Sequence, residues 1–153
     1  MKQINKYIVE RLHINKDIDH HNYHPKTRNE LKELVNKLIK ERGNKADLND
    51  IDTSEITDMY QLFYKSEFNG DISNWNVSNV KDMSSMFAYS EFTGENGDIS
   101  NWDVSNVKDM EAMFFMSLFN GYISNWNVSN VKDMYDMFYG SPIEKNPPKW
   151  YKE

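Results

Sequence analysis

Large apolar side chains recur along the chain from residue 48 onward at a nearly constant spacing. Tryptophans stand at positions 75, 102 and 126, which are 27 and then 24 residues apart. Steps of 24 residues outward from this set reach Ile51 on one side and Trp150 on the other. Further columns keep the same offsets: Met59, Met83, Met110 and Met134; Leu62, Met86, Met113 and Met137; Phe63, Phe87, Phe114 and Phe138; Phe68, Phe92, Phe119 and Ile143. The pattern predicts four full copies and a truncated fifth, stacked so that neighbouring copies bury each other's apolar faces.

Each copy divides into a segment with strand spacing and a segment with turn spacing. Ile72-x-x-Trp75-x-Val77 places two apolar side chains on one face of a short strand, so parallel strands are expected near 48–53, 72–77, 99–104 and 123–128. Apolar residues three and four apart between Asp82 and Phe87 favour a helical or 3₁₀ turn, with the aspartate as its cap. Asn-Gly pairs, as at Gly70, predict turns that use positive φ.

The first 46 residues do not repeat and are predicted to be helical. Apolar residues at helical spacing indicate a short helix over 3–13, and a capping box at Thr27 to Glu30 begins a stronger helix that ends near Gly43. A repeat array needs a cover on its terminal apolar layer. We therefore expect an N-terminal helical cap over 1–46 and a repeat domain over 47–153.

Charge and composition exclude several function classes. Residues 1–50 hold 11 basic and 8 acidic side chains, a net of +3, whereas residues 51–153 hold 7 and 16, a net of −9. An acidic repeat domain repels nucleic-acid phosphates, so no nucleic-acid partner is expected. No signal peptide, lipid-attachment cysteine or bilayer-length apolar run is present, so a membrane is not expected as partner, and a cytoplasmic or virion-associated location is the default.

Candidate chemistry is sparse. No phosphate-binding, dinucleotide-binding, nucleophile-elbow or zinc-protease motif is present, and the repeated serines have no histidine nearby in sequence. The sequence thus indicates a non-enzyme without cofactor or metal. All four histidines lie between His13 and His24, and His20 and His24 have the spacing of a helical metal pair. Pro25 disfavours that helix, so a solvated linker is the preferred interpretation of this cluster and a metal site the alternative.

Two surfaces are candidate binding sites. The positions after the phenylalanine column differ between copies, which indicates that packing does not dictate them and that their apolar side chains face a partner. The residues proposed on this basis are Phe115, Met116, Leu118, Tyr64, Tyr89 and Tyr139. The alternative is that these aromatics tuck into the outer side of the repeats. A polar face on the predicted strands is the second candidate, although stacked and solvated amides would look the same; it comprises Asn74, Asn76, Asn101, Asp103, Asn125 and Asn127.

The repeated unit W-[ND]-V-S-N-V-K-D-M-x-x-M-F resembles the BspA-like, mycoplasma-lipoprotein-type repeat of bacterial surface proteins, over residues 48–151. That family is regarded as an offshoot of the leucine-rich repeats, and its members are implicated in adhesion or protein binding. The resemblance implies an α/β repeat solenoid, a leucine-rich-repeat-like right-handed coil with a short parallel β-sheet and short helical turns, capped by N-terminal α-helices. Val80, Val107 and Val131 stand where an ordinary leucine-rich repeat has its ladder asparagine.

We therefore expect a non-catalytic protein-binding or scaffolding module of bacterial or phage origin. The alternative is a structural or self-assembling component, such as a virion decoration protein or a surface adhesin. A protein partner is expected, and self-association is the second possibility.

Overall fold

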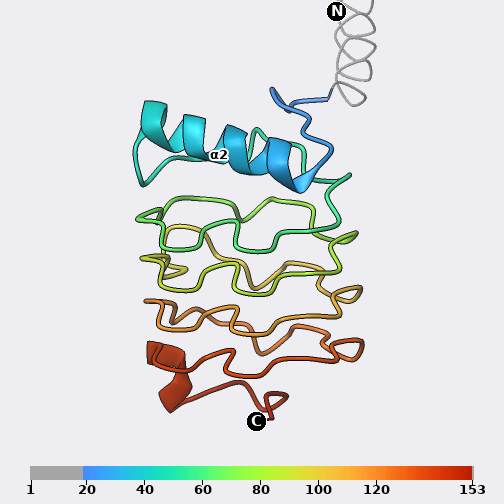
Figure 1. Cartoon of the computed structure of the whole chain (residues 1–153), viewed down its shortest axis with the longest axis vertical. Helices are drawn as coiled ribbons and strands as arrows, with labels where there is room; N and C mark the ends of the chain where they lie inside the picture. The colour runs from blue at the N-terminus through green and yellow to red at the C-terminus, as the bar shows by residue number, and fades with distance from the viewer. Residues whose placement is uncertain (1–18, 153) are drawn as a thin grey trace, which may run out of the picture.

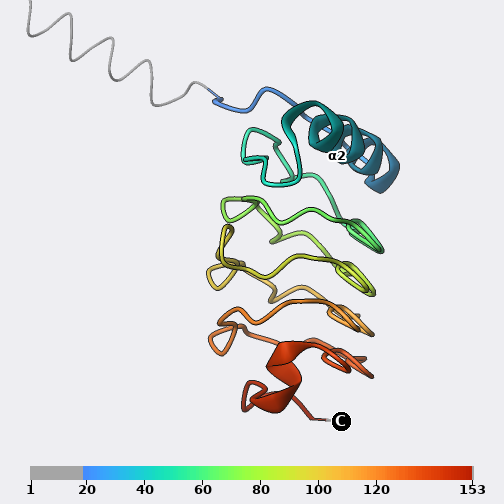
Figure 2. The same cartoon turned by 90° about the vertical axis from the view of Figure 1, so that its left-hand side faces the viewer.

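The computed structural model describes residues 19–152 as a stack of coils that follow one another in chain order (Figures 1 and 2). Helix α2, Arg28–Arg42, lies across the first coil, and the 3₁₀ helix η1, Pro142–Lys145, lies in the last (Figure 1). Neither of these two helices, the ones found between residues 19 and 152, has the length and apolar character to cross a bilayer. The helix predicted over 3–13 lies outside the described residues.

Helix α2 confirms the prediction made from its capping residues. The Thr27 hydroxyl accepts a hydrogen bond from the Glu30 N–H at 3.2 Å, and the Gly43 N–H donates to Ile39 O at 2.8 Å. The Glu30 carboxylate accepts from the Lys26 N–H rather than from Thr27, so the box is shifted by one residue. Leu31, Val35 and Leu38 are fully buried, and they belong to one core with the coils. The helix therefore covers the apolar layer that the first coil would otherwise expose.

The predicted columns form the core. Phe63, Phe87, Phe114 and Phe138 stack along the whole array, with ring centroids 5.3, 5.4 and 6.0 Å apart and nearly parallel planes. Within each of the first three coils a second phenylalanine packs on the first, as Phe119 does on Phe114 at 4.0 Å. Stacking like residues on like residues explains why these positions are filled alike in every copy.

The predicted parallel β-sheet is wrong, and with it the α/β repeat solenoid of the leucine-rich-repeat kind. Residues 19–152 contain no strand; the pairing there consists of isolated parallel bridges, such as Asp58 to Asp82 and Asp82 to Asp109. The reason is local. The segment Ile72 to Val80 curls twice, because Trp75 N–H donates to Ile72 O and Val80 N–H donates to Val77 O, both across three residues. The periodic burial of Trp75 and Val77 is real, but turns produce it.

The backbone link between coils lies in the segment predicted to be helical, which is another correction. Alternate N–H groups of Met59, Gln61, Phe63 and Lys65 donate to carbonyls of the next coil, and the pattern repeats at the following two interfaces. The acceptors at the first interface are the carbonyls of Asp82, Ser84, Met86 and Ala88. This inter-coil ladder requires left-handed backbone at non-glycine positions, for example φ 52° at Ala112. The segment is thus a chain of turns rather than a helix.

Side chains complete the hydrogen bonding where the backbone curls away. The indole N–H groups of Trp75, Trp102 and Trp126 each donate to a carbonyl of the preceding coil, namely Leu48, Ile72 and Ile99, at 2.9, 3.3 and 3.0 Å. One turn later, the side-chain amides of three surface asparagines also donate to carbonyls of the preceding coil. These asparagines are Asn79, Asn106 and Asn130. The buried valines at 80 and 107 therefore need no ladder asparagine beside them, because tryptophan supplies the buried donor.

The aspartate column caps the turns as predicted. The carboxylates of Asp58, Asp82, Asp109 and Asp133 each accept the N–H two residues on, at 2.8 to 2.9 Å. Burial raises the pKa of Asp109 above its ordinary value, and the neighbouring carboxylates of Asp82 and Asp133 add to the rise. The capping bond offsets part of that cost.

Helix α2 also satisfies the end of the inter-coil ladder. The first coil has no preceding coil to donate to its carbonyls. Arg28 Nε donates to Tyr60 O at 2.6 Å, and Lys32 Nζ donates to Leu62 O at 2.5 Å and to Gln61 O at 3.4 Å. Arg28 and Lys32 are four residues apart and so share one helix face. Burial lowers the pKa of the Lys32 ammonium, and the nearby charge of Arg28 adds to this effect.

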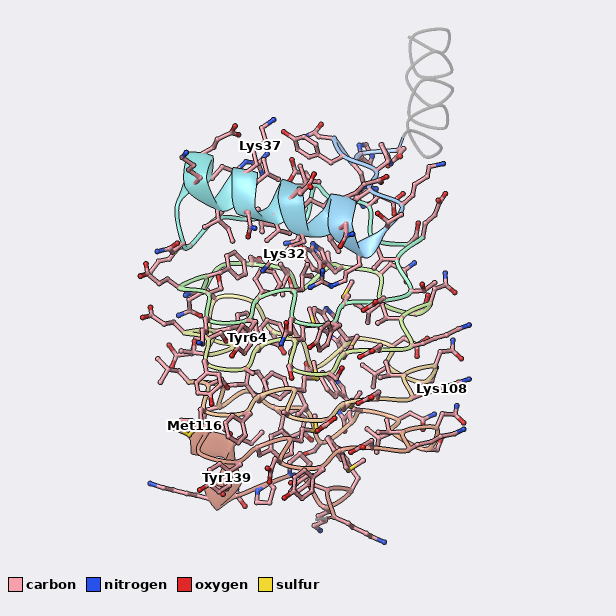
Figure 3. All side chains as sticks on the ribbon, viewed as in Figure 1. Lys32, Lys37, Tyr64, Lys108, Met116 and Tyr139 are labelled. Atoms are coloured by element: carbon pink, nitrogen blue, oxygen red, sulfur yellow. The ribbon has the colours of Figure 1, made fainter. Side chains whose placement is uncertain are left out.

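Replacing Lys32 with methionine is expected to lower the free energy of unfolding by roughly 1–2 kcal/mol, since carbonyls at the ladder end lose their donor while the aliphatic stem is kept. Lys37→Met is the matched control, because Lys37 is exposed and points away from the coils (Figure 3). Chemical denaturation followed by circular dichroism measures both. Equal stabilities for the two variants would contradict the capping role.

Candidate partner-binding surface

An aromatic column runs down one edge of the stack. Tyr64, Tyr89, Phe115 and Tyr139 contact one another in that order, with ring centroids 5.8, 5.4 and 5.3 Å apart. Figure 3 shows Tyr64, Met116 and Tyr139 on the same side, with Lys108 on the opposite edge. Six residues were predicted at this surface. The four aromatic ones form the aromatic column, and the other two, Met116 and Leu118, lie beside its lower half.

The aromatic column is continuous, although its residue in the second coil does not occupy the same repeat position as in the other coils. In the second coil the residue directly after the core phenylalanine is the buried Ala88, and the next residue, Tyr89, completes the column instead. Tyr89 has a left-handed backbone, with φ 57°, which turns its side chain toward the edge. Lys65 Nζ lies 5.3 Å from the Tyr64 ring and 5.7 Å from the Tyr89 ring, so a cation sits over the upper end of the column.

The lower half of this surface is its most exposed apolar part. Met116 is 48% exposed, Leu118 52% and Tyr139 54%. The prediction that these side chains are at least partly exposed is confirmed for all six residues, although Tyr64 and Phe115 are shielded by their neighbours.

Glycine and a carboxylate shape a groove beside Met116. A Cβ on Gly140, where φ is 71°, would collide with the Met116 sulfur, so the glycine makes room for that side chain. The Glu144 carboxylate accepts the Gly140 N–H at 3.0 Å and holds η1 against the coil. The resulting groove of about 350 Å³ is lined by Met116, Leu118, Gly140, Pro142, Glu144 and Lys145, among others.

The polar face has another use in this fold. The side-chain oxygens of Asn76, Asp103 and Asn127 each accept the N–H of the serine two residues on, at 3.0 to 3.1 Å. Asp103 also accepts the Ser105 hydroxyl, and this bond, together with the one from the Ser105 N–H, holds the pKa of Asp103 below its ordinary value. Asn74, Asn101 and Asn125 are exposed, and the Asn74 N–H donates to Asn49 Oδ1 of the preceding coil. Half of the face therefore serves to cap turns, which leaves fewer free groups for a ligand.

Sequence reasoning missed other exposed aromatics. Tyr135 is 68% exposed, Tyr122 62% and Tyr60 42%. Tyr60 and Tyr135 follow the methionine column, where other copies have Ser84 and Glu111. The same variation between copies that singled out the aromatic column was thus a usable signal at these positions.

Comparison with known proteins identifies a family but no characterised relative. No curated protein and no solved structure matches the chain. A family model described as "Mycoplasma protein of unknown function, DUF285" matches residues 29–150, from α2 to the truncated fifth copy. The chain belongs to this DUF285 family.

Proposed function

We propose that this protein is a non-catalytic binding module that holds a protein partner against the aromatic column and its Met116–Leu118 extension. The observation that carries the proposal is the continuity of four contacting aromatic rings across four coils, ending beside half-exposed Met116 and Leu118. Exposed aromatic and methionine side chains in one patch have the composition of the centre of a protein interface.

The resemblance of the repeat unit to BspA-like surface proteins supports the same function, because members of that family are implicated in adhesion or protein binding. The ladder of the stack holds the column rigidly, so side chains lose little freedom when a partner docks. A cation at Lys65 and a carboxylate at Glu144 mark the two ends of the surface, which would fix the orientation of a partner.

Site-specific photo-crosslinking tests the proposal. A photoreactive phenylalanine analogue at position 118 is expected to give a discrete crosslinked species in extract of the native cells, whereas the same analogue at position 108, on the opposite edge, gives none. In the protein that carries the analogue at position 118, the further substitution Met116→Asp should reduce the yield of crosslinked species at least tenfold, because a charge replaces an apolar contact. Aspartate tolerates the left-handed backbone at this position, where φ is 53°, so the melting temperature should stay close to that of the parent.

The outcomes separate the function classes. A species with twice the mass of the chain would favour the alternative, a self-assembling structural component, and light scattering would then show an oligomer. Equal crosslinking from positions 108 and 118, or none from either, would contradict the proposed surface.

A further inference from the structure

A group of metal-ligand side chains forms where the segment before α2 meets the first coil. Asp19, His24 and Asp52 each place one ligand atom within 4.8 Å of the others. His24 Nε2 lies 3.4 Å from Asp19 Oδ2, and His24 Nδ1 lies 3.4 Å from Asp52 Oδ2. The sequence suggested pairing His24 with His20. The fold instead brings it to a carboxylate 28 residues away.

The backbone beneath this group is held firmly. The Asn22 and Tyr23 N–H groups donate to Asp50 O, and the Asp52 N–H donates to Tyr23 O at 2.8 Å, which pairs residues 22–23 with 50–52 in parallel. The Asp50 carboxylate accepts from Asn22 Nδ2 and from both terminal nitrogens of Arg42. These contacts fix the position of Asp52 relative to the segment that carries His24, and Asp19 is oriented separately by His21.

Each carboxylate already has one oxygen occupied and the other turned to His24. Asp19 Oδ1 lies 2.7 Å from His21 Nδ1 and also accepts the His21 N–H. Asp52 Oδ1 accepts the Ser54 N–H at 2.9 Å. The second oxygen of each is the one near the His24 ring. Hydrogen bonds of this kind orient and fix the carboxylate ligands of metal sites.

The chemistry of the three groups selects a class of ion. One imidazole nitrogen and two carboxylate oxygens suit zinc and its divalent neighbours, with water completing the coordination. Two ligands bonded at about 2.1 Å to a tetrahedral ion lie about 3.4 Å apart. An ion can bind only one nitrogen of the His24 ring, and Nδ1 has this separation from Asp52 Oδ2. The Asp19 carboxylate would supply the third ligand, since one ligand atom from each of the three residues lies within 4.8 Å of the others. Calcium prefers six or more oxygens, which this group does not offer.

We propose that Asp19, His24 and Asp52 bind a zinc-class divalent ion that fastens residues 19–25 to the first coil. The competing arrangement is a protonated His24 bridging the two carboxylates without a metal. His21, whose ring lies 6.3 Å from that of His24, contacts the other oxygen of Asp19 through its Nδ1.

Isothermal titration of the full chain with zinc chloride at pH 7.5 tests the site. We expect saturable binding with a micromolar or lower Kd and a higher melting temperature in the presence of zinc. His24→Ala and Asp52→Asn should each weaken binding at least tenfold. His24 is exposed, and an asparagine at 52 can still accept the Ser54 N–H, so neither variant should fail to fold. His20→Ala is the matched control and should bind as the parent does.

Two results would overturn the proposal. Absence of saturable zinc binding would leave the protonated bridge as the explanation of the geometry. Zinc binding that survives the His24→Ala, Asp52→Asn double variant would place the ion on other histidines.

Discussion

Replacing Phe114 with alanine is expected to lower the free energy of unfolding by about 3–5 kcal/mol. Phe114 is fully buried in the middle of the stack, and its ring contacts Phe87, Phe119, Phe138 and Trp126. The neighbouring rings are held by the inter-coil ladder, so they cannot collapse into the cavity that alanine leaves.

Chemical denaturation monitored by circular dichroism would measure this loss. Tyr135→Ala is the control, because Tyr135 is 68% exposed and its truncation should change stability by less than about 0.5 kcal/mol. A Phe114→Ala variant as stable as the control would show that the phenylalanine column does not carry the core.

Gly70→Ala is expected to destabilise the protein by about 3 kcal/mol through overpacking. A Cβ at this position would overlap the backbone oxygen of Ala46 and lie 2.9 Å from Ala46 N, and neither atom can move without shifting the link between α2 and the first coil. The Asp71 N–H donates to the same carbonyl at 2.9 Å, so a shift of Ala46 O would also disturb this backbone hydrogen bond.

Gly121→Ala is the matched substitution at the equivalent Asn-Gly pair of a later copy. Its Cβ would meet only the ring of Phe119, at 2.7 Å, and a ring can tilt where a backbone cannot. Thermal and chemical denaturation should therefore show that the Gly70→Ala variant is much less stable than the Gly121→Ala variant. Equal losses at the two positions would mean that ring crowding, and not the backbone approach at Ala46, sets the requirement for glycine.

These glycines illustrate what sequence reasoning could and could not reach. The Asn-Gly pairs were predicted to form turns with positive φ, and this prediction is wrong: 69–70 and 96–97 contain only bends, 120–121 is irregular, and Gly70, Gly97 and Gly121 are not among the positive-φ residues. Gly70 and Gly97 are needed because another backbone passes close by; a Cβ on Gly97 would lie 2.7 Å from Gly70 O. A sequence shows that glycine recurs at a position. Only the structure shows whether glycine is needed there for its positive φ or for the close approach of another backbone.

The columns and the caps of α2 could be predicted because both depend on residues at fixed offsets along the chain. The β-sheet was wrong because the spacing of Ile72, Trp75 and Val77 fits a strand and a pair of turns equally well. Side-chain donors decide between them: the Trp75 indole binds Leu48 O, which frees the backbone to curl. Likewise, the approach of His24 to Asp52 depends on how the cap docks, which no local pattern records.

The inter-coil ladder gives its own edge of the stack an electrical direction. The N–H groups of the ladder that begins at Met59 point toward the later coil, so the peptide dipoles of this edge add as they do in an α-helix, whereas other backbone groups, such as those of Lys81 and Lys108, donate back to the preceding coil. The negative end of this ladder is the first coil, whose carbonyls accept from Arg28 and Lys32 of α2, and its positive end is the last coil, where Glu144 accepts the Gly140 N–H. An added 24-residue unit would lengthen the ladder between these ends and leave both charged ends in place.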